Sequence, residues 1–479
     1  SVILSKFNTV EISKISCMQL SQNEDHNFSL SKFESMLKTN DVLFFDSNEF
    51  EGIIFHYLET GKFALAKKAV KLGLEQHPDA SVLKLFKVEI LIFENKLTEA
   101  DLLLNELHEL EPSNDEIYIQ KANIFSKQDN HEMAINTLET ALEFTAEEAE
   151  IYSLMAMEYM FLEDYENAKL NFMRCLELEN DDYAALYNII YCFDFLEQRR
   201  EAIDYLNLFL DKHPYSEVAW HQVGKQYFDL KEYDKALAAF DFAIISDDYF
   251  VGAYMEKGKV LEKMGRLKEA IENYHITLEL DDPTAFAYLR IGKCYEKLKK
   301  SKLALDFYSK AVDEDPLLDK AWIAITDFYA RKLNYPKALY YINKAISIDS
   351  ENVLYWKRFA KINNRLNYVE EAEKGYQKAI ELGNYELETW ITRCDLLINL
   401  GEFETALDTM YQAIEFYPET AEIEYRLAGL YFCLNQGDRG YYHLKNALKI
   451  DAEYSIIIEE LFPEIFKRNS VKTLIDKHA

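Results

Sequence analysis

The stretch AWHQVGKQYFDLKEYDKALAAFDFAI, residues 219–244, carries the pattern that decides the fold. Its first half places Trp220 and Tyr227 seven residues apart, a spacing that puts two large side chains on one face of a helix. Its second half is rich in alanine around Ala236, and small side chains let two helices approach to about 8 Å. The stretch therefore predicts a pair of antiparallel helices.

The same pattern recurs along most of the chain with a period of 34 residues. An alanine marks each period, and we refer to these as the marker alanines: Ala66, Ala100, Ala134, Ala168, Ala202, Ala236, Ala270, Ala304, Ala338, Ala372 and Ala406. A twelfth step reaches Gly440, which is also small. All four tryptophans of the chain lie sixteen residues before a marker. A fixed period of this length is typical of stacked helical units, none of which can bury its apolar face alone.

These columns resemble the tetratricopeptide repeat, whose W-x2-L-G-x2-Y…A…F…A…P scheme they follow in order, best at residues 219–244 and 253–274. The resemblance covers residues 47–454 as twelve units. It implies an all-α, right-handed superhelical solenoid of about twelve helix-turn-helix repeats, in which the first helices line a concave binding groove. We expect residues 1–46 to contain a short N-terminal helix and residues 455–479 to form a C-terminal capping helix.

Composition narrows the class of partner and compartment. The 479 residues include 53 Lys+Arg and 84 Asp+Glu, a formal charge of −31, which disfavours nucleic acid as a partner. No apolar run reaches 18 residues, so we expect no membrane insertion. The six cysteines form no C-x-x-C pair, which favours free thiols in a reducing compartment and a cytoplasmic location.

The sequence offers no chemistry for catalysis. It lacks the phosphate-binding, dinucleotide-binding, zinc-protease and nucleophile-elbow motifs, and no two histidines have the spacing of a helical metal site. We therefore expect a protein that is not an enzyme and that uses no cofactor or metal.

The family geometry directs five positions of each first helix toward the groove, those lying 15, 14, 11, 8 and 7 residues before the marker. In repeats 2 to 5 these positions are mostly apolar, and such a surface is typical of a partner site. The candidates are Leu85, Phe86, Ile92, Phe93, Leu154, Met157, Met160, Phe161, Tyr187, Tyr191 and Phe195. The alternative is that neighbouring helices already cover them.

In repeats 6 to 10 the same positions become basic. The candidates are Lys225, Lys259, Lys263, Arg290, Lys293, Lys297, Arg331, Arg358, Lys361 and Arg365. Their natural ligand would be an acidic or C-terminal peptide, because Lys and Arg heads pair with carboxylates. The alternative is an ion-paired surface, since Glu256, Glu262 and Glu296 lie among them.

The sequence thus favours a scaffold or adaptor that binds an extended protein or peptide segment with acidic and apolar residues. Two alternatives remain at this point: an RNA- or ribosome-associated factor that uses the same basic positions, and a self-assembling structural scaffold.

Overall fold

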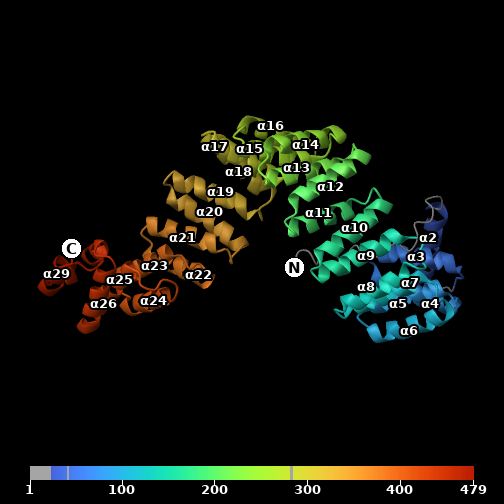
Figure 1. Ribbon diagram of the computed structural model, residues 1–479, viewed down its shortest axis with the longest axis horizontal. Helices are drawn as coiled ribbons and strands as arrows, with labels where there is room; N and C mark the ends of the chain where they lie inside the picture. The colour runs from blue at the N-terminus through green and yellow to red at the C-terminus, as the bar shows by residue number, and fades with distance from the viewer. Residues whose placement is uncertain (1–22, 40–42, 281–283, 479) are drawn as a thin grey trace. The chain divides into compact units, whose positions relative to one another are not determined.

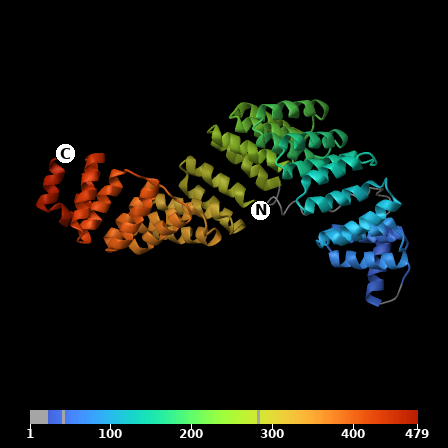
Figure 2. The same cartoon turned by 60° about the horizontal axis from the view of Figure 1, so that its bottom comes forward.

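The computed structural model describes residues 23–39, 43–280 and 284–478, and every regular element among them is a helix. The chain divides into two compact units, residues 1–226 and 227–479. Within each unit, consecutive helices lie side by side (Figures 1 and 2). The fold class is therefore all-α, as the repeat period predicts.

Twelve helix pairs follow one another between residues 47 and 450 among the described residues. The pairs are α3(Ser47–Glu59) with α4(Phe63–Gln76), α5(Ser81–Phe93) with α6(Leu97–Leu110), α7(Asp115–Lys127) with α8(His131–Ala141), α9(Glu148–Phe161) with α10(Tyr165–Leu178), α11(Tyr183–Phe195) with α12(Arg199–Lys212), α13(Glu217–Asp229) with α14(Tyr233–Ser246), α15(Val251–Lys263) with α16(Leu267–Leu280), α17(Ala285–Lys297) with α18(Ser301–Glu314), α19(Asp319–Arg331) with α20(Tyr335–Ile348), α21(Val353–Arg365) with α22(Val369–Glu381), α23(Leu387–Leu400) with α24(Phe403–Phe416), and α25(Ala421–Cys433) with α26(Gly437–Ile450). We number the pairs as repeats 1 to 12.

Within each unit, the marker alanines lie at the contact between the two helices of a pair. All eleven are fully buried, and Gly440 takes the same place in repeat 12, where the ring of Phe432 packs against it. A larger side chain would separate the two helices, since tightly packed interiors accommodate extra methylenes poorly. The predicted role of this column is confirmed.

The turn between the two helices of a pair always contains one residue with positive φ. Twelve such residues recur every 34 positions, from Gly61 to Asn435, and only Gly61, Gly265 and Gly401 are glycines. At Leu333, where φ is 56°, the backbone N–H donates to the carbonyl of Ala330 and closes the end of α19. The sequence reveals only the three glycines, because the other turns place an L-residue in a conformation that glycine adopts more easily.

Both ends of the array are covered by additional helices. In α2(Asn23–Thr39), Phe33 and Met36 are buried against repeat 1. At the other end, η1(Glu453–Ser455), α27(Ile456–Leu461), α28(Pro463–Phe466) and α29(Asn469–Asp476) follow repeat 12.

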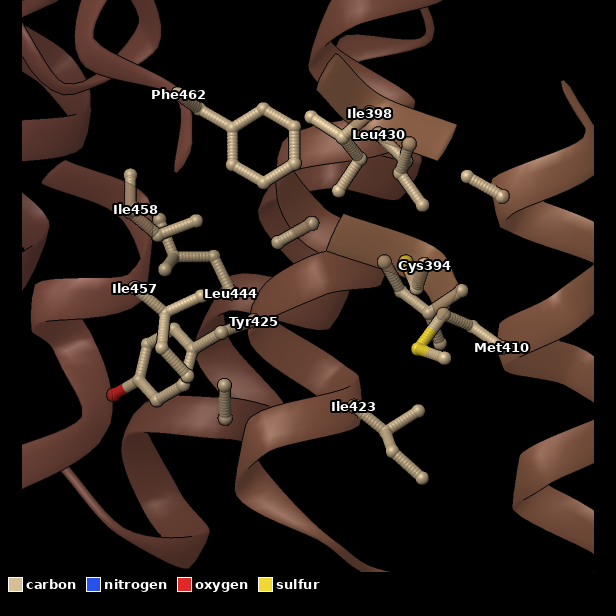
Figure 3. Packing of buried hydrophobic residues seen from close by; sticks show 14 of the residues in the cluster. Cys394, Ile398, Met410, Ile423, Tyr425, Leu430, Leu444, Ile457, Ile458 and Phe462 are labelled. Carbon is tan, nitrogen blue, oxygen red and sulfur yellow. The ribbon is translucent and has the colours of Figure 1, made fainter. Parts of the chain in front are cut away.

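The expected C-terminal capping helix is therefore divided into short helices. Pro463 causes the break between α27 and α28, because its ring cannot follow a preceding helical turn, and it begins α28 instead. The division turns Phe462 onto Gly429 of α25, where the absence of a Cβ makes room for the ring. Figure 3 shows Ile457, Ile458 and Phe462 among the side chains of the last apolar cluster.

Two partly buried carboxyl groups lie in repeats 2 and 3. Burial, together with the charge of Glu116, raises the pKa of Glu89 to about 7. Burial also raises the pKa of Glu116, although Gln120 donates a hydrogen bond of 2.7 Å to its carboxylate. Because the folded pKa of Glu89 exceeds the model-peptide value of 4.5, its ionisation opposes folding, and stability falls as pH rises from about 4.5 to above 7.

We expect Leu333→Gly to stabilise the protein by about 1 kcal/mol, because it removes the strain of an L-residue at positive φ. Leu333 is exposed, so little packing is lost. The midpoint of urea denaturation, followed by circular dichroism, should rise. In the reciprocal control, Gly265→Leu at the equivalent turn should lower the midpoint, and a fall with both variants would contradict this interpretation of the turn.

We expect Glu89→Gln to stabilise the protein at pH 8.5 by on the order of 3 kcal/mol, since one pKa unit corresponds to about 1.36 kcal/mol. At pH 4.5 the gain should almost vanish, because the native carboxyl is then protonated. Urea denaturation at the two pH values measures the difference, and an equal gain at both would show that ionisation of Glu89 is not the cause.

Candidate protein-interaction surfaces

Three of the four apolar groove candidates of repeat 2 belong to the core and form no open surface. Leu85 is 6% exposed and Phe86 is 1% exposed, and Ile92 is also buried. Leu85 and Ile92 share a cluster with α6 and α7, whereas Phe86 packs into the core of repeat 1. The expectation that these three line an open groove is therefore wrong, and the physical reason is the coverage by neighbouring helices that the sequence left open as the alternative.

Two further candidates are aromatic rings that stack on the preceding repeat. Phe93 lies 4.2 Å from Phe63, and Phe161 lies 5.0 Å from His131, measured between ring centroids. Both phenylalanines remain exposed despite the stack. Leu154, Met157 and Met160 in α9 are half-buried, so repeat 4 presents a mixed surface.

Helix α11 in repeat 5 carries the most continuous exposed apolar face of the candidates. Tyr183, Tyr187, Tyr191 and Phe195 follow one another every four residues and are 40%, 44%, 41% and 58% exposed. Side chains four residues apart are neighbours on a helix surface, so the four rings form one stripe, which we call the α11 stripe.

The α11 stripe is held in place by the buried opposite face of its helix and by a stack on the preceding repeat. The opposite face of the helix buries Leu186, Ile189 and Phe193, and Phe195 stacks on Tyr165 of α10 at 4.0 Å. The helix is therefore apolar on both faces, a pattern typical of a helix that is covered on both sides. Tyr183 was missed from the sequence because it lies nineteen residues before its marker, outside the five groove positions.

Six of the ten basic candidates are ion-paired, five of them with a carboxylate of a neighbouring first helix. Between nitrogen and oxygen, Arg290 and Lys297 lie 2.8 and 3.2 Å from Glu262, Arg331 lies 2.7 Å from Glu296, and Arg358 lies 3.1 Å from Asp327. Lys259 pairs with Glu256 on its own helix at 2.6 Å. The alternative of an ion-paired surface therefore holds for these residues.

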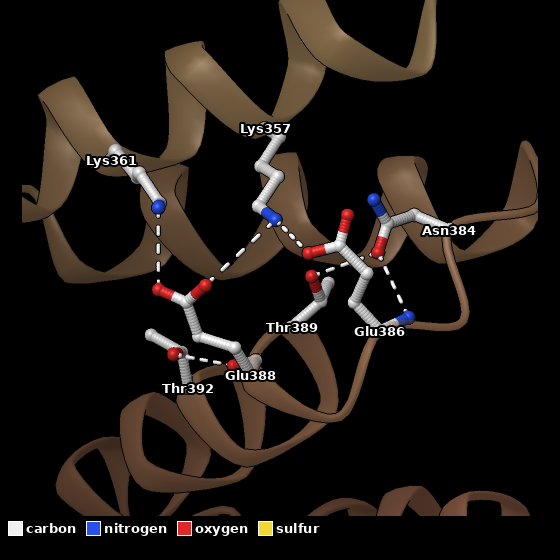
Figure 4. A network of polar contacts seen from close by, with 7 residues as sticks. All are labelled: Lys357, Lys361, Asn384, Glu386, Glu388, Thr389 and Thr392. Carbon is white, nitrogen blue, oxygen red and sulfur yellow. Dashed lines mark hydrogen bonds and ion pairs between the residues drawn. The ribbon is translucent and has the colours of Figure 1, made fainter.

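In repeat 10, too, cations of a first helix pair with carboxylates of the next first helix. Lys357 and Lys361 of α21 reach toward Glu386 and Glu388 at the start of α23 (Figure 4). The distance between Lys361 Nζ and Glu388 Oε1 is 3.2 Å. Thr392 donates from its hydroxyl to the backbone carbonyl of Glu388, so the carboxylate belongs to an ordered first turn.

Sequence reasoning missed one such pair. Arg426 of α25 forms two hydrogen bonds, of 2.7 and 2.8 Å, with Asp395 of α23, and its side chain is almost fully buried. Asp395 and Arg426 lie 68 residues, or two periods, after Asp327 and Arg358. The repeat phase could therefore have identified the pair.

Four basic candidates form no ion pair within the part of the chain that the structure describes. Lys225, Lys263 and Arg365 are exposed, and Lys293 is half-buried. Burial lowers the pKa of Lys293, and the nearby charge of Arg290 lowers it further. These four cations are the ones available to an anionic partner.

The described residues show neither a metal centre nor a membrane span. Nowhere among residues 23–39, 43–280 and 284–478 do three His, Cys, Asp or Glu side chains gather closely enough to hold a metal ion. Over the same ranges, no helix has the length and apolar character needed to cross a bilayer. What the surfaces offer chemically is stacking, apolar burial and ion pairing.

Comparisons with known proteins agree with the helix pairs. Three family models described as tetratricopeptide repeat match residues 115–147 with 149–182, residues 255–318, and residues 184–216. Among curated proteins, anaphase-promoting complex subunit 3 of Schizosaccharomyces pombe (strain 972 / ATCC 24843) is 26% identical over 159 residues, or 33% of this chain and 24% of that protein. The chain thus aligns with about a quarter of that relative's length.

Solved structures with similar folds include the Cut9–Hcn1 hetero-tetramer of APC/C. It is 12% identical, and the alignment covers 95% of this chain and 94% of that chain with a TM-score of 0.36. YrrB, described as a TPR protein with an unusual peptide-binding site, is 19% identical over 37% of this chain and 92% of its own, with a TM-score of 0.30.

The family matches coincide with the helix pairs of repeats 3, 4, 5, 7 and 8, and the 34-residue phase that they share continues through the marker alanines on either side. The chain therefore contains tetratricopeptide repeats over residues 115–147, 149–182, 184–216 and 255–318.

Proposed function

We propose that the chain is a non-catalytic protein-interaction scaffold that binds an extended partner segment through its first helices. The observation that carries the proposal is the α11 stripe, four half-exposed aromatic rings on one rigid helix. Aromatic side chains on a rigid element are the residues that most often dominate binding energy at protein interfaces. Stacking on Tyr165 holds Phe195 in place before any partner arrives.

The chemistry of the surfaces in each unit supports the kind of partner that we propose. Apolar residues of the segment would contact the α11 stripe and the exposed rings of Phe93 and Phe161 in repeats 2 to 5. Acidic residues would contact cations of repeats 6 to 10, foremost those without an ion pair among the described residues. The curated relative is named as a subunit of a protein complex, and assembly with other proteins is the use proposed here too.

The two alternatives from the sequence have less support. Six of the ten basic candidates are ion-paired with carboxylates of the same chain, which leaves fewer cations for RNA phosphates. Self-assembly would require a complementary surface on a second copy, and no observation above singles one out. We place the protein in the cytoplasm, where its buried thiols, such as Cys294 and Cys394, would stay reduced.

We expect Tyr187→Ser combined with Tyr191→Ser to weaken partner binding at least tenfold, or about 1.4 kcal/mol, because both rings lose their contact with the partner. The partner would be identified by crosslinking in the native cell and purified, and its Kd measured by calorimetry. Because both tyrosines are exposed, helicity by circular dichroism should not change.

A matched control replaces Tyr249 and Tyr340, two exposed tyrosines of residues 227–479, with serine. This control should bind with the native Kd. If the α11 double variant also keeps the native Kd, the α11 stripe is not the binding surface and the proposal fails.

A further inference from the structure

A compact group of cations surrounds the ring of Phe286 in repeats 7 and 8. The Nζ atom of Lys259 lies 5.5 Å from the ring centroid, and the guanidinium carbon of Arg290 lies 6.0 Å from it. Lys293 stands on the same helix as Arg290, less than one turn further along α17. The half-buried ring thus contacts two cationic groups through cation–π contacts, and a third cation stands on the helix that carries the ring.

The carboxylates in this group do not balance its charge. Glu256 pairs with Lys259, and Glu262 is shared by Arg290 and Lys297. Four cations, Lys259, Arg290, Lys293 and Lys297, therefore face two carboxylates. The remaining neighbours of Lys293 are Lys320, which adds charge, and Glu296, which is already paired with Arg331.

Lys293 is the cation without a partner. It is half-buried, and it forms no ion pair or hydrogen bond with any residue that the structure describes. Burial and the charge of Arg290 both act against its ammonium group, and they lower its pKa. A bound anion would relieve this cost, since an opposite charge nearby favours the charged form of a lysine.

Arg290 also has N–H donors that are not used within the protein's own contacts. Arg290 donates from Nε to the hydroxyl of Tyr274 at 3.3 Å, and its Nη2 pairs with Glu262. A guanidinium has five N–H donors in a fixed fork, so donors remain beyond these two contacts. The buried Tyr274 and Glu262 fix the orientation of that fork.

We propose that Lys259, Arg290 and Lys293 form a binding site for a phosphate monoester carried by a partner segment, such as a phosphorylated serine. This inference rests on the proposed function of repeats 6 to 10. The excess of two positive charges matches a phosphate monoester, which carries about −1.5 to −2 at neutral pH, better than a single carboxylate. Its three terminal oxygens can accept hydrogen bonds from three separate cationic heads.

The test uses immobilised peptide mixtures that are random except for a central phosphoserine, glutamate or serine. The full chain should retain the phosphoserine mixture at least tenfold better than the other two. Lys293→Gln should lower that retention to the level of the glutamate mixture. The matched control is Lys310→Gln in α18, which removes a lysine already paired with Asp306 and should retain the native preference.

Two outcomes would overturn the inference. Equal retention of the phosphoserine and glutamate mixtures would show that the group has no preference for phosphate. Retention of random-sequence single-stranded RNA as strong as that of the phosphoserine mixture, with the same loss in Lys293→Gln, would assign the group to nucleic acid. Neither result affects the α11 stripe, whose variants are measured with the purified partner, so failure of this site is distinguishable from failure of the proposed function.

Discussion

The close contact between the two helices of each pair is the constraint on which the rest of the structure depends. It requires a side chain no larger than a methyl group at the marker position, and all eleven marker alanines are fully buried. At some contacts even a methyl group does not fit, and the residue there is glycine. A Cβ added at Gly258 would lie 2.5 Å from the ring of Tyr274, and one at Gly292 would lie 2.5 Å from Tyr308. In repeat 7 and again in repeat 8, the two helices of the pair therefore approach each other around a buried tyrosine.

That tyrosine connects the core of a repeat to the contact with the next one. The hydroxyl of Tyr274 donates to Glu262 at 2.8 Å, and Glu262 in turn pairs with Arg290 and Lys297 of the following first helix. One period later, Tyr308 donates to Glu296 at 2.6 Å, and Glu296 pairs with Arg331. Exposed ion pairs contribute little to stability on their own. Here a buried hydroxyl already holds the carboxylate in place, so less side-chain entropy is lost when the pair forms.

The sequence predicts the periodic part of this structure and fails where the outcome depends on contacts between repeats. The period and the burial of the marker alanines follow from side-chain size alone. Leu85 and Phe86 show the limit, because a helical position that faces outward from its own pair can still be covered by a neighbouring helix. The turns show another limit, since residues such as Leu333 adopt positive φ only because the pair on either side requires it. Pro463 was visible in the sequence, yet its effect on Phe462 depends on the space above Gly429.

The same comparison indicates which groove positions remain for a partner. The residue seven before the marker contacts the preceding repeat in both units: Phe195 does so by stacking on Tyr165, and Arg331 by pairing with Glu296. The residue eleven before the marker is bound less regularly. It is the half-exposed Tyr191 in repeat 5 and the unpaired Lys293 in repeat 8. Repeat-to-repeat packing thus leaves this position exposed or unpaired in repeats 5 and 8, whereas Asp327 and Asp395 at the same position pair with arginines of the following repeat.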